Sequence, residues 1–511
     1  MRDVDVPVPN LGLLAHLERR NVPPNGLAET ENWIYRDGEF QVRPGVAFFG
    51  NNPAQRPMGY AQYRHLDGEI RTVKGTVSGW WKYNAGTNTW VNITGTALSG
   101  SPTQQQVFRV FQKAGTTSLL GTNEANTLKK WDGLAASYSE VGGAPPRARC
   151  MALSAERVLL ANLKSGGTVS PVGVDVSAAQ DFDKGWGTEQ VSLLADTPGE
   201  IIGMMERGNL LTNIYKTDAI YHAIAVGAAD PFRFELREVL EKDSGPCSTL
   251  AIIKVSEGLD AYLGLDGAPR LYDGVSRPVE FSRAASKWIK DNANFSTLGR
   301  AWTSYDPLNK ELWFVFSEKN KTDPNLAAII DPRTGIFHPY RWDTLRFSAG
   351  IKLNASTGLT IGELVGTIGT QELTIGEYAA IEPRMILGEI GGQSFKDSAT
   401  NDNGAAITTF WESGLHNLSG LRRRFVDVQE IHHYFAKVLA AQDVTVKVGK
   451  SDYGEDRTLS AGQTLAIGSD GPYKTGHRIS GRYVSQRVEA NATQAIKYKG
   501  STAVVVDRGL R

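Results

Sequence analysis

Short runs of alternating hydrophobic and polar residues, separated by turn residues, recur along the first two thirds of the chain. In the segment 32–40, NWIYRDGEF, an aromatic and β-branched run is followed by Asp37-Gly38 and then by a returning run. This pattern is typical of a β-hairpin with a tight turn. It recurs from about residue 55 to 350, with turn residues at 84–86, Asp132-Gly133, Asp266-Gly267, Asp273-Gly274, Asp306-Pro307 and 331–335. The sequence therefore predicts an all-β fold.

Two of the predicted hairpins share a local form, in which an aromatic residue precedes Asp-Gly, at 131–133 and 272–274. Pairing the candidate hairpins gives roughly six units of about 45–50 residues, a length typical of β-propeller blades. A string of β-sandwiches is the second interpretation. A propeller solves the problem of exposed edges that so many short strands would create. We therefore favour a β-propeller, with strands from residues 30–50 completing the last blade.

Helical periodicity is sparse. Residues 282–295 can form one amphipathic helix with Ala285, Trp288 and Ile289 on one face, which we expect as an insertion on the propeller rim. After residue 405 the pattern changes to that of six to eight antiparallel strands, which predicts a separate C-terminal β-sandwich of about 100 residues. The predicted domains are an N-terminal arm with propeller-closing strands at 1–50, a β-propeller at 51–355, a repeat connector at 356–405 and a β-sandwich at 406–511.

The predicted connector contains the triplet Thr-Ile-Gly three times at a spacing of seven, with the isoleucines Ile361, Ile368 and Ile375. A helix here would contain several interior glycines, each costing about 1 kcal/mol. A continuous strand would place isoleucines seven residues apart on opposite faces. We therefore interpret the repeat as a looped connector, with a turn in every unit, that leads from the propeller to the sandwich.

Composition narrows the class of protein. The 511 residues are 41% hydrophobic, which is typical of a globular chain, and 54 glycines suit a fold with many tight turns. The 55 basic and 55 acidic residues cancel, which argues against a protein whose main task is to hold nucleic acid by counterion release. A neutral conduit for nucleic acid stays compatible with this balance. Residues 1–20 lack the apolar core of a signal peptide and no run is long enough for a membrane span, so we expect a chain made in a reducing cytoplasm.

Few residues suggest chemistry. The sequence contains no G-x-S-x-G or H-E-x-x-H motif and no phosphate-binding glycine loop. We therefore predict neither an enzyme nor a cofactor or metal site. Cys150 and Cys247 are interpreted as small buried hydrophobes. His432 and His433 would point to opposite faces of a strand, so the two cannot easily bind one ion together.

One basic run is a candidate for binding. Arg422, Arg423 and Arg424 are consecutive and could contact the phosphates of DNA or an acidic partner. The simpler interpretation is a solvated edge that protects a strand from mispairing. Both interpretations stay open at this point.

Three segments carry a resemblance to a known family. The segment 29–50, ETENWIYRDGEFQVRPGVAFFG, resembles the opening of phage tail proteins, which has an Asn-aromatic pair, a short turn with Gly and then Arg-Pro-Gly. The Thr-Ile-Gly repeat resembles Thr-Ile/Trp-Asp repeats of the same group, with Gly in place of Asp. The segment 481–509 resembles its closing strands but lacks the Trp often found there. The matching residues of the opening are Asn32, Trp33, Gly38, Arg43, Pro44 and Gly45.

The chain is thus similar to the nozzle proteins of short-tailed bacteriophages, also called tail tubular protein B, which are related to the packaged-DNA stabilisation hub proteins. The resemblance implies a structural virion protein that assembles in the host bacterial cytoplasm as a ring, with a hexamer expected. The ring would adjoin the adaptor and portal-side proteins and the tail fibres or needle. It would contact genomic double-stranded DNA transiently, retain it in the head and let it exit on infection, without catalysis.

An alternative function belongs to another class. A glycan- or receptor-binding propeller on the virion surface would be expected to expose a cluster of aromatic side chains. The candidates in this sequence are Trp80, Trp81 and Trp90.

Overall fold

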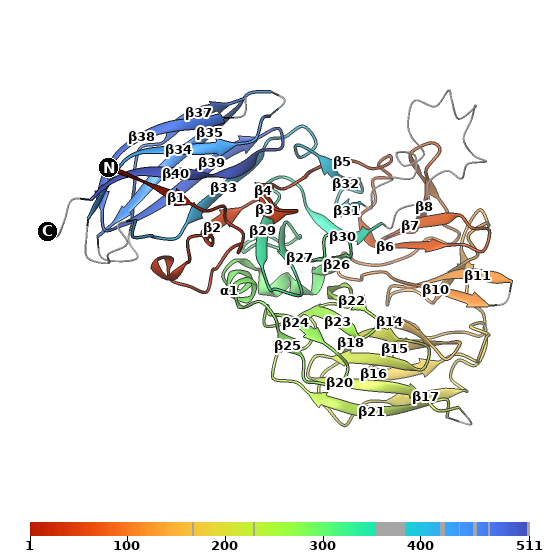
Figure 1. Cartoon of the computed structure of the whole chain (residues 1–511). Helices are drawn as coiled ribbons and strands as arrows, with labels where there is room; N and C mark the ends of the chain where they lie inside the picture. Colours follow the sequence, from red (N-terminus) through yellow and green to blue (C-terminus); the bar gives the residue numbers. More distant parts are fainter. Residues whose placement is uncertain are drawn as a thin grey trace.

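The computed structural model describes residues 1–113, 115–165, 168–227, 230–353, 384–418, 425–438, 440–452, 457–468 and 471–507. In these ranges the regular secondary structure is almost entirely β-strand, which confirms the all-β prediction. Two bodies are visible in Figure 1, a propeller and a sandwich, and the N-terminal segment runs between them.

Seven four-stranded antiparallel sheets form the propeller within the described residues. The first three blades consist of β6 (Pro57–Arg64), β7 (Ile70–Thr76), β8 (Trp80–Asn84) and β9 (Thr89–Asn92); β10 (Val107–Lys113), β11 (Thr116–Thr122), β12 (Lys129–Trp131) and β13 (Ser139–Glu140); and β14 (Arg147–Ser154), β15 (Arg157–Ser165), β16 (Thr168–Val176) and β17 (Gln190–Leu193). In each blade the strands pair in chain order, as successive hairpins.

The next three blades follow the same order. They consist of β18 (Ile201–Arg207), β19 (Leu211–Lys216), β20 (Ala219–Ala225) and β21 (Phe232–Val239); β22 (Ile252–Ser256), β23 (Leu259–Leu263), β24 (Pro269–Tyr272) and β25 (Val279–Glu280); and β26 (Trp302–Asp306), β27 (Glu311–Phe316), β28 (Leu326–Ile330) and β29 (Phe337–Arg341).

The seventh blade closes the ring. It combines β30 (Phe347–Lys352), β31 (Met385–Glu389) and β32 (Ser394–Ala399) with β5 (Gly45–Phe48) from the N-terminal segment. The first strands of successive blades contact one another around the ring, and β30 contacts β6 of the first blade. The predicted closure by strands from residues 30–50 holds for β5 alone, which ties the two ends of the propeller together, whereas the other two strands of this stretch lie in the sandwich.

Two predictions about this region were wrong. The propeller has seven blades rather than roughly six. The segment containing the Thr-Ile-Gly repeat does not lead to the sandwich, because the strands on either side of it, β30 and β31, pair with each other in one blade. The seventh blade was missed because its second and third strands lie beyond this insertion. The closure entropy of a loop grows slowly with length, so a blade can accept a long insertion between paired strands.

The predicted turns agree with the structure where they are described. Asp132 and Asp273 each follow an aromatic residue, and the Oδ1 atom of each accepts hydrogen bonds from two backbone N–H groups further along the turn. Gly133 and Gly274 have φ values of +87° and +79°, which glycine adopts without strain. The shared aromatic-Asp-Gly form is thus one turn used in two blades.

The helix predicted at 282–295 is α1 (Arg283–Asn292), between blades five and six. The Ser282 side chain caps its N-terminus by accepting a hydrogen bond from Ala285 N. Ala285 and Ile289 are buried, and Trp288 packs against Phe337. Three short 3₁₀ helices complete the helical elements of the described residues, at Arg19–Asn21, Thr249–Ala251 and Phe295–Arg300.

The sandwich consists of two six-stranded sheets. One sheet contains β1 (Arg2–Val6), β3 (Trp33–Arg36), β4 (Glu39–Val42), β34 (Val426–Phe435), β38 (Gly471–Gly481) and β40 (Lys497–Asp507). The other contains β2 (Leu27–Glu31), β33 (Ile407–Ser413), β35 (Gln442–Ser451), β36 (Thr458–Leu459), β37 (Gln463–Ile467) and β39 (Tyr483–Ala492).

The sandwich therefore does not consist of residues 406–511 alone, as the sequence predicted. Its apolar core includes Leu27, Trp33 and Phe40 from the N-terminal segment, each 0% exposed. The 32–40 hairpin is confirmed as β3 and β4, with Asp37 and Gly38 both at positive φ in the turn. Pairing between strands more than 450 residues apart leaves no local signal, so its partner sheet could not be predicted.

Candidate functional site at the junction of the two domains

Some of the residues singled out from the sequence lie in the part of the chain that the structure describes, and others do not. Arg422, Arg423 and Arg424, and the isoleucines Ile361, Ile368 and Ile375, lie outside the described residues. Cys150 and Cys247 are buried free thiols, as predicted, and burial raises the pKa of each to about 12. The described residues contain no cluster of His, Cys, Asp and Glu suited to a metal ion.

His432 and His433 lie on opposite faces of β34, as predicted. His433 is 0% exposed, with Nε2 2.9 Å from Thr475 Oγ1 and Nδ1 2.9 Å from Gln486 Nε2. Burial lowers the pKa of His433 to about 3, so its ring is neutral at neutral pH. His432 is partly exposed and lies 3.6 Å from Glu430.

The tryptophans proposed for a glycan surface are mostly internal. Trp80 and Trp90 are 1% and 2% exposed. The Trp80 Nε1 atom donates to Gln106 Oε1, and Trp90 Nε1 donates to the Phe49 carbonyl. Trp81 is only partly buried. These residues therefore do not form an exposed aromatic cluster.

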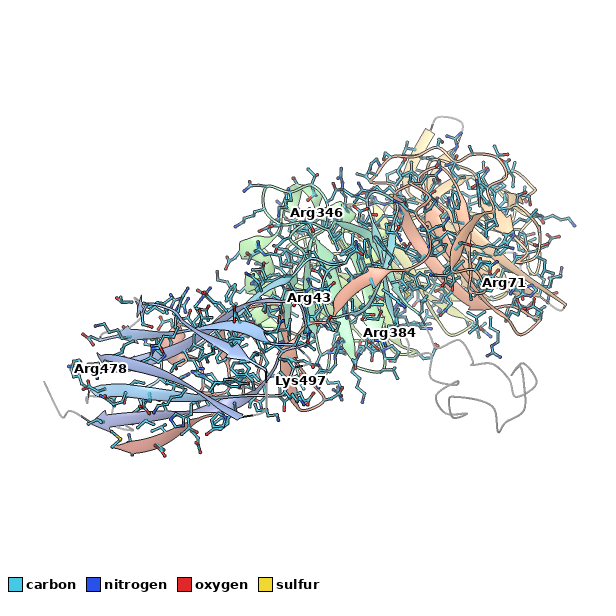
Figure 2. All side chains as sticks on the ribbon, turned by 90° about the horizontal axis from the view of Figure 1, so that it is seen from above. Arg43, Arg71, Arg346, Arg384, Arg478 and Lys497 are labelled. Carbon is cyan, nitrogen blue, oxygen red and sulfur yellow. The ribbon has the colours of Figure 1, made fainter. Side chains whose placement is uncertain are left out.

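The chain crosses between the propeller and the sandwich at two neighbouring segments, which we call the neck: residues 43–44 and residues 400–406. Arg43 on the first crossing forms a bidentate ion pair with Asp402 on the second, at 2.6 and 2.9 Å. Arg43 also donates to the Arg341 carbonyl of blade six and lies over the Tyr340 and Trp342 rings. Figure 2 places Arg43 between the two bodies. The buried guanidinium of Arg43 thus joins the two crossings of the neck to blade six.

Asn32 supports this arrangement. Its Oδ1 atom accepts hydrogen bonds from Arg43 Nε and from the Arg341 backbone N–H, both at 2.8 Å. Its Nδ2 atom donates to the Thr408 carbonyl of the sandwich. Asn32 has φ +63°, a conformation that Asn adopts more readily than most residues.

The close packing at the neck explains why the Arg-Pro-Gly sequence ends in a glycine, Gly45. A Cβ atom at this position would lie 2.1 Å from the Asn401 carbonyl oxygen, because the two crossings approach closely. Three of the residues that carry the resemblance to phage tail proteins, Asn32, Arg43 and Gly45, therefore meet at the neck. Sequence reasoning could not find Asp402, which has no motif around it.

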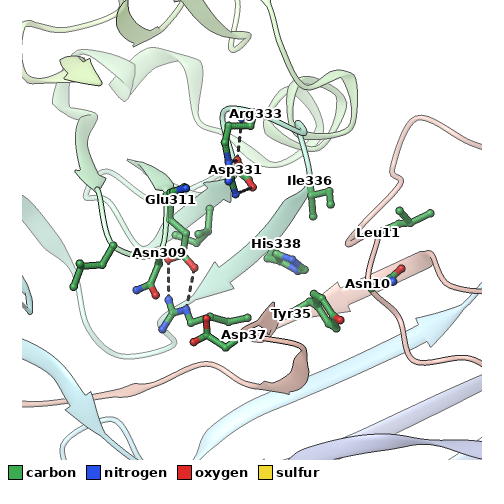
Figure 3. Close-up of a pocket in the computed structure, with 14 residues that line it drawn as sticks. Asn10, Leu11, Tyr35, Asp37, Asn309, Glu311, Asp331, Arg333, Ile336 and His338 are labelled. Atoms are coloured by element: carbon green, nitrogen blue, oxygen red, sulfur yellow. Dashed lines mark hydrogen bonds and ion pairs between the residues drawn. The ribbon is translucent and has the colours of Figure 1, made fainter. Parts of the chain in front are cut away.

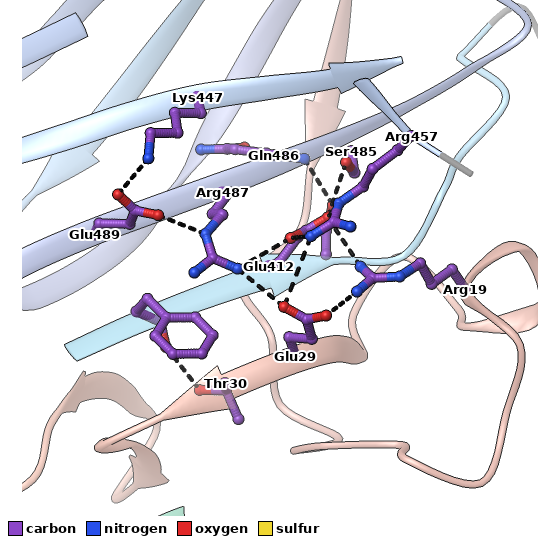
Figure 4. A network of polar contacts seen from close by, with 12 residues as sticks. Arg19, Glu29, Thr30, Glu412, Lys447, Arg457, Ser485, Gln486, Arg487 and Glu489 are labelled. Carbon is purple, nitrogen blue, oxygen red and sulfur yellow. Dashed lines mark hydrogen bonds and ion pairs between the residues drawn. The ribbon is translucent and has the colours of Figure 1, made fainter. Parts of the chain in front are cut away.

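A second polar cluster, the Glu412 network, holds the N-terminal segment on the sandwich (Figure 4). The Glu412 carboxylate is 0% exposed and pairs with Arg19, Arg457 and Arg487. Arg19 and Arg487 also bind Glu29 of β2. Burial works against the charge of Arg487, but Glu489 and Glu412 outweigh it and raise its pKa. A buried carboxylate is stable here because several cations surround it.

A third feature is the junction pocket, a cavity of about 510 Å³ between blade six and the N-terminal segment. Arg36 and Glu311 form a bidentate pair on its wall, at 3.0 and 2.7 Å, and His338 reaches into it from β29 (Figure 3). Burial raises the pKa of Glu311 and lowers that of His338 to about 3. No motif in the sequence marks these residues, because they come together only in the fold.

One side chain crosses the propeller axis at one end. Gln105, just before the second blade, donates from Nε2 to the Ala301 carbonyl at the start of blade six. Its Oε1 atom accepts a hydrogen bond from Leu250 N at the start of blade five. Since blades five and six stand across the ring from blade two, this amide spans the axis.

Comparisons with known proteins add little. No protein family and no curated protein matches the sequence. Among solved structures, the chain is similar to the crystal structure of Saccharomyces cerevisiae Sqt1, at a TM-score of 0.37 and 10% identity, over 73% of this chain and 100% of that one. A similarity of this size carries no argument about function. The described helices include none that could span a membrane.

Proposed function

We propose that this chain is a structural subunit of a bacteriophage tail, which assembles into a nozzle ring at the distal end of the DNA channel. The ring retains packaged DNA and lets it leave on infection. The observation that carries the proposal is the place of the resembling residues. Asn32, Arg43 and Gly45 join the propeller to the sandwich and are not arranged around a ligand. A ring that holds pressurised DNA needs subunits whose domains keep a fixed relative position.

The Gln105 side chain across the propeller axis bears on the path of the DNA. Because Gln105 spans the axis at one end, the DNA would run between neighbouring subunits and not through each propeller. The zero net charge suits this task, since strong attraction to phosphate would slow the exit of DNA. We expect six copies around the tail axis, adjoining adaptor or portal-side proteins and fibres or a needle.

Labelling of virus particles tests the proposal. Antibodies raised against the sandwich and tagged with gold should bind at the distal end of the tail. Quantitative mass spectrometry of the particle should give about six copies of this chain per particle, if the ring is a hexamer. Label on the capsid, or absence of the chain from purified particles, would contradict the proposal.

The alternative of a glycan-binding propeller surface has less support. Two of its three candidate tryptophans are buried in blade one, so a sugar cannot stack on them.

A further inference from the structure

The junction pocket is walled by both bodies of the molecule. The propeller contributes the turns around Asn309 and Asp331 and the side chain of His338, whereas the N-terminal segment contributes Tyr35 and Arg36. Ligand pockets are frequent at domain interfaces and commonly measure about 300–1,000 Å³. A volume of about 510 Å³ lies within that range.

His338 lines the pocket from β29. The residue is 4% exposed, and its Nδ1 atom has no hydrogen-bond partner among the described residues. Figure 3 shows the His338 ring on the propeller side, opposite Tyr35 and Asn10 of the N-terminal segment. The Nδ1 atom itself is closed off from the cavity, so a bound molecule would meet His338 at the part of its ring that lines the pocket.

The charges around the pocket are balanced. Arg36 is bound to Glu311 and Arg333 to Asp331, while Lys310 and Asp37 lie at the rim with opposite charges. A charged ligand would find an unpaired counterion only at the exposed rim, at Lys310 or Asp37, where an ion pair is worth little. A neutral ligand needs no counterion.

The paired groups still offer hydrogen bonds. Arg36 uses Nε and Nη2 on Glu311, so N–H groups of the same guanidinium stay available, and carboxylate oxygens have further lone pairs. Together with His338 and Asn309, the wall presents donors and acceptors without net charge. Hydroxyl groups both donate and accept, so a molecule with several neighbouring hydroxyls matches this wall.

We propose that the junction pocket binds one neutral sugar unit, whose hydroxyl groups meet His338, the Arg36–Glu311 pair and Asn309. A flat heteroaromatic ligand fits less well, because the walls consist mainly of polar and aliphatic side chains such as Leu11 and Ile336. This assignment does not depend on the nozzle ring, since the pocket lies within one chain.

Saturation-transfer NMR on the full chain tests the assignment, with glucose, galactose, mannose and N-acetylglucosamine as probes. At least one should bind with a Kd of about 1 mM, as expected for a small ligand with few groups to bury. Glucuronate and glucosamine should bind at least about tenfold more weakly, because each carries a charge. His338→Phe should abolish binding of the neutral sugar.

Two variants keep the result interpretable. His222→Phe replaces another buried histidine, which pairs with Tyr272 outside the pocket, and should leave sugar binding unchanged. Tyr35→Phe removes only a hydroxyl at the pocket wall and should weaken binding by about three- to tenfold, so it replaces His338→Phe if that variant does not fold. If no neutral sugar binds the wild type, or if folded His338→Phe and Tyr35→Phe bind as the wild type does, the assignment is wrong.

Discussion

The propeller and the sandwich differ in how the chain builds them. Six of the seven blades are continuous segments of the chain, and only the last borrows a strand, β5. Each sheet of the sandwich instead combines strands from the first 42 residues with strands after residue 406. The sandwich is therefore complete only when both ends of the chain are present, whereas most blades depend on local hairpins.

The interiors of the two domains both contain polar groups. In the sandwich, His433, Thr475, Gln486 and Ser501 bond to one another. In the propeller, Asn213 and Tyr215 donate to the buried carboxylate of Asp260. Buried histidines make stability depend on protonation state, and they occur in both domains, so acid should weaken both.

Removing residues 1–42 should have the largest effect. The sandwich would lose four strands and the buried side chains of Leu27, Trp33 and Phe40, each worth about 1.5–3 kcal/mol. We expect the region 407–507 to become sensitive to protease and to exchange its amides fully, while blades one to six stay protected. Hydrogen exchange followed by mass spectrometry measures both.

Removing residues 1–6 is the matched control for this truncation. It takes away only the edge strand β1, so the sandwich should keep its protection. A sandwich that stays folded without residues 1–42 would contradict the discontinuous assembly described above.

Arg43→Ala should have the next largest effect, because it leaves Asp402 and Asn32 without their partner in the neck. Breaking a buried ion pair costs about 3–5 kcal/mol, which urea denaturation can measure. Arg333→Ala removes a similar bidentate Arg–Asp pair at the surface and should cost less than about 1 kcal/mol. Equal costs for the two variants would show that the neck is not a buried clamp.

Acid should destabilise the sandwich by a smaller amount. Histidine in an unfolded chain has a pKa of about 6.5, whereas burial lowers the pKa of His433 to about 3 and of His477 to about 4. At pH values between the folded and the unfolded pKa, the histidines bind protons in the unfolded chain but not in the folded sandwich. Stability is therefore full above about pH 6.5 and falls as the pH drops, by about 2 kcal/mol per histidine at pH 5.

Thermal unfolding at pH 7 and pH 5 measures this loss. His477→Phe removes one titrating group and should reduce the difference between the two pH values by about 2 kcal/mol. An unchanged pH dependence in the folded variant would contradict the role assigned to His477.

The turns of the propeller should give the smallest effect. Asp273→Ala removes an acceptor for Val275 N and Ser276 N in an exposed turn, and Asp132→Ala does the same in blade two. Each should cost about 1 kcal/mol in urea denaturation, since the blade keeps its other contacts. Costs that differ greatly between the two would show that the turns are not equivalent.

The sequence predicted the elements that form within a few residues, but not the pairing of strands that lie far apart in the chain. The Asp-Gly turns, α1 and the 32–40 hairpin were predictable because backbone preferences and hydrophobic spacing act within a few residues. The partner sheet of that hairpin and the seventh blade depend on pairing across hundreds of residues, which no pattern records. The pocket was beyond reach for the same reason, since it brings Tyr35 and Arg36 against His338.

Cryo-electron microscopy of the virus particle that contains this chain tests the central claim most directly. The account predicts six copies in a ring on the tail axis, with the sandwich and propeller of every copy in the same relative position and the DNA path between subunits. A chain located away from the tail axis, or copies in which the two domains take different relative positions, would contradict it.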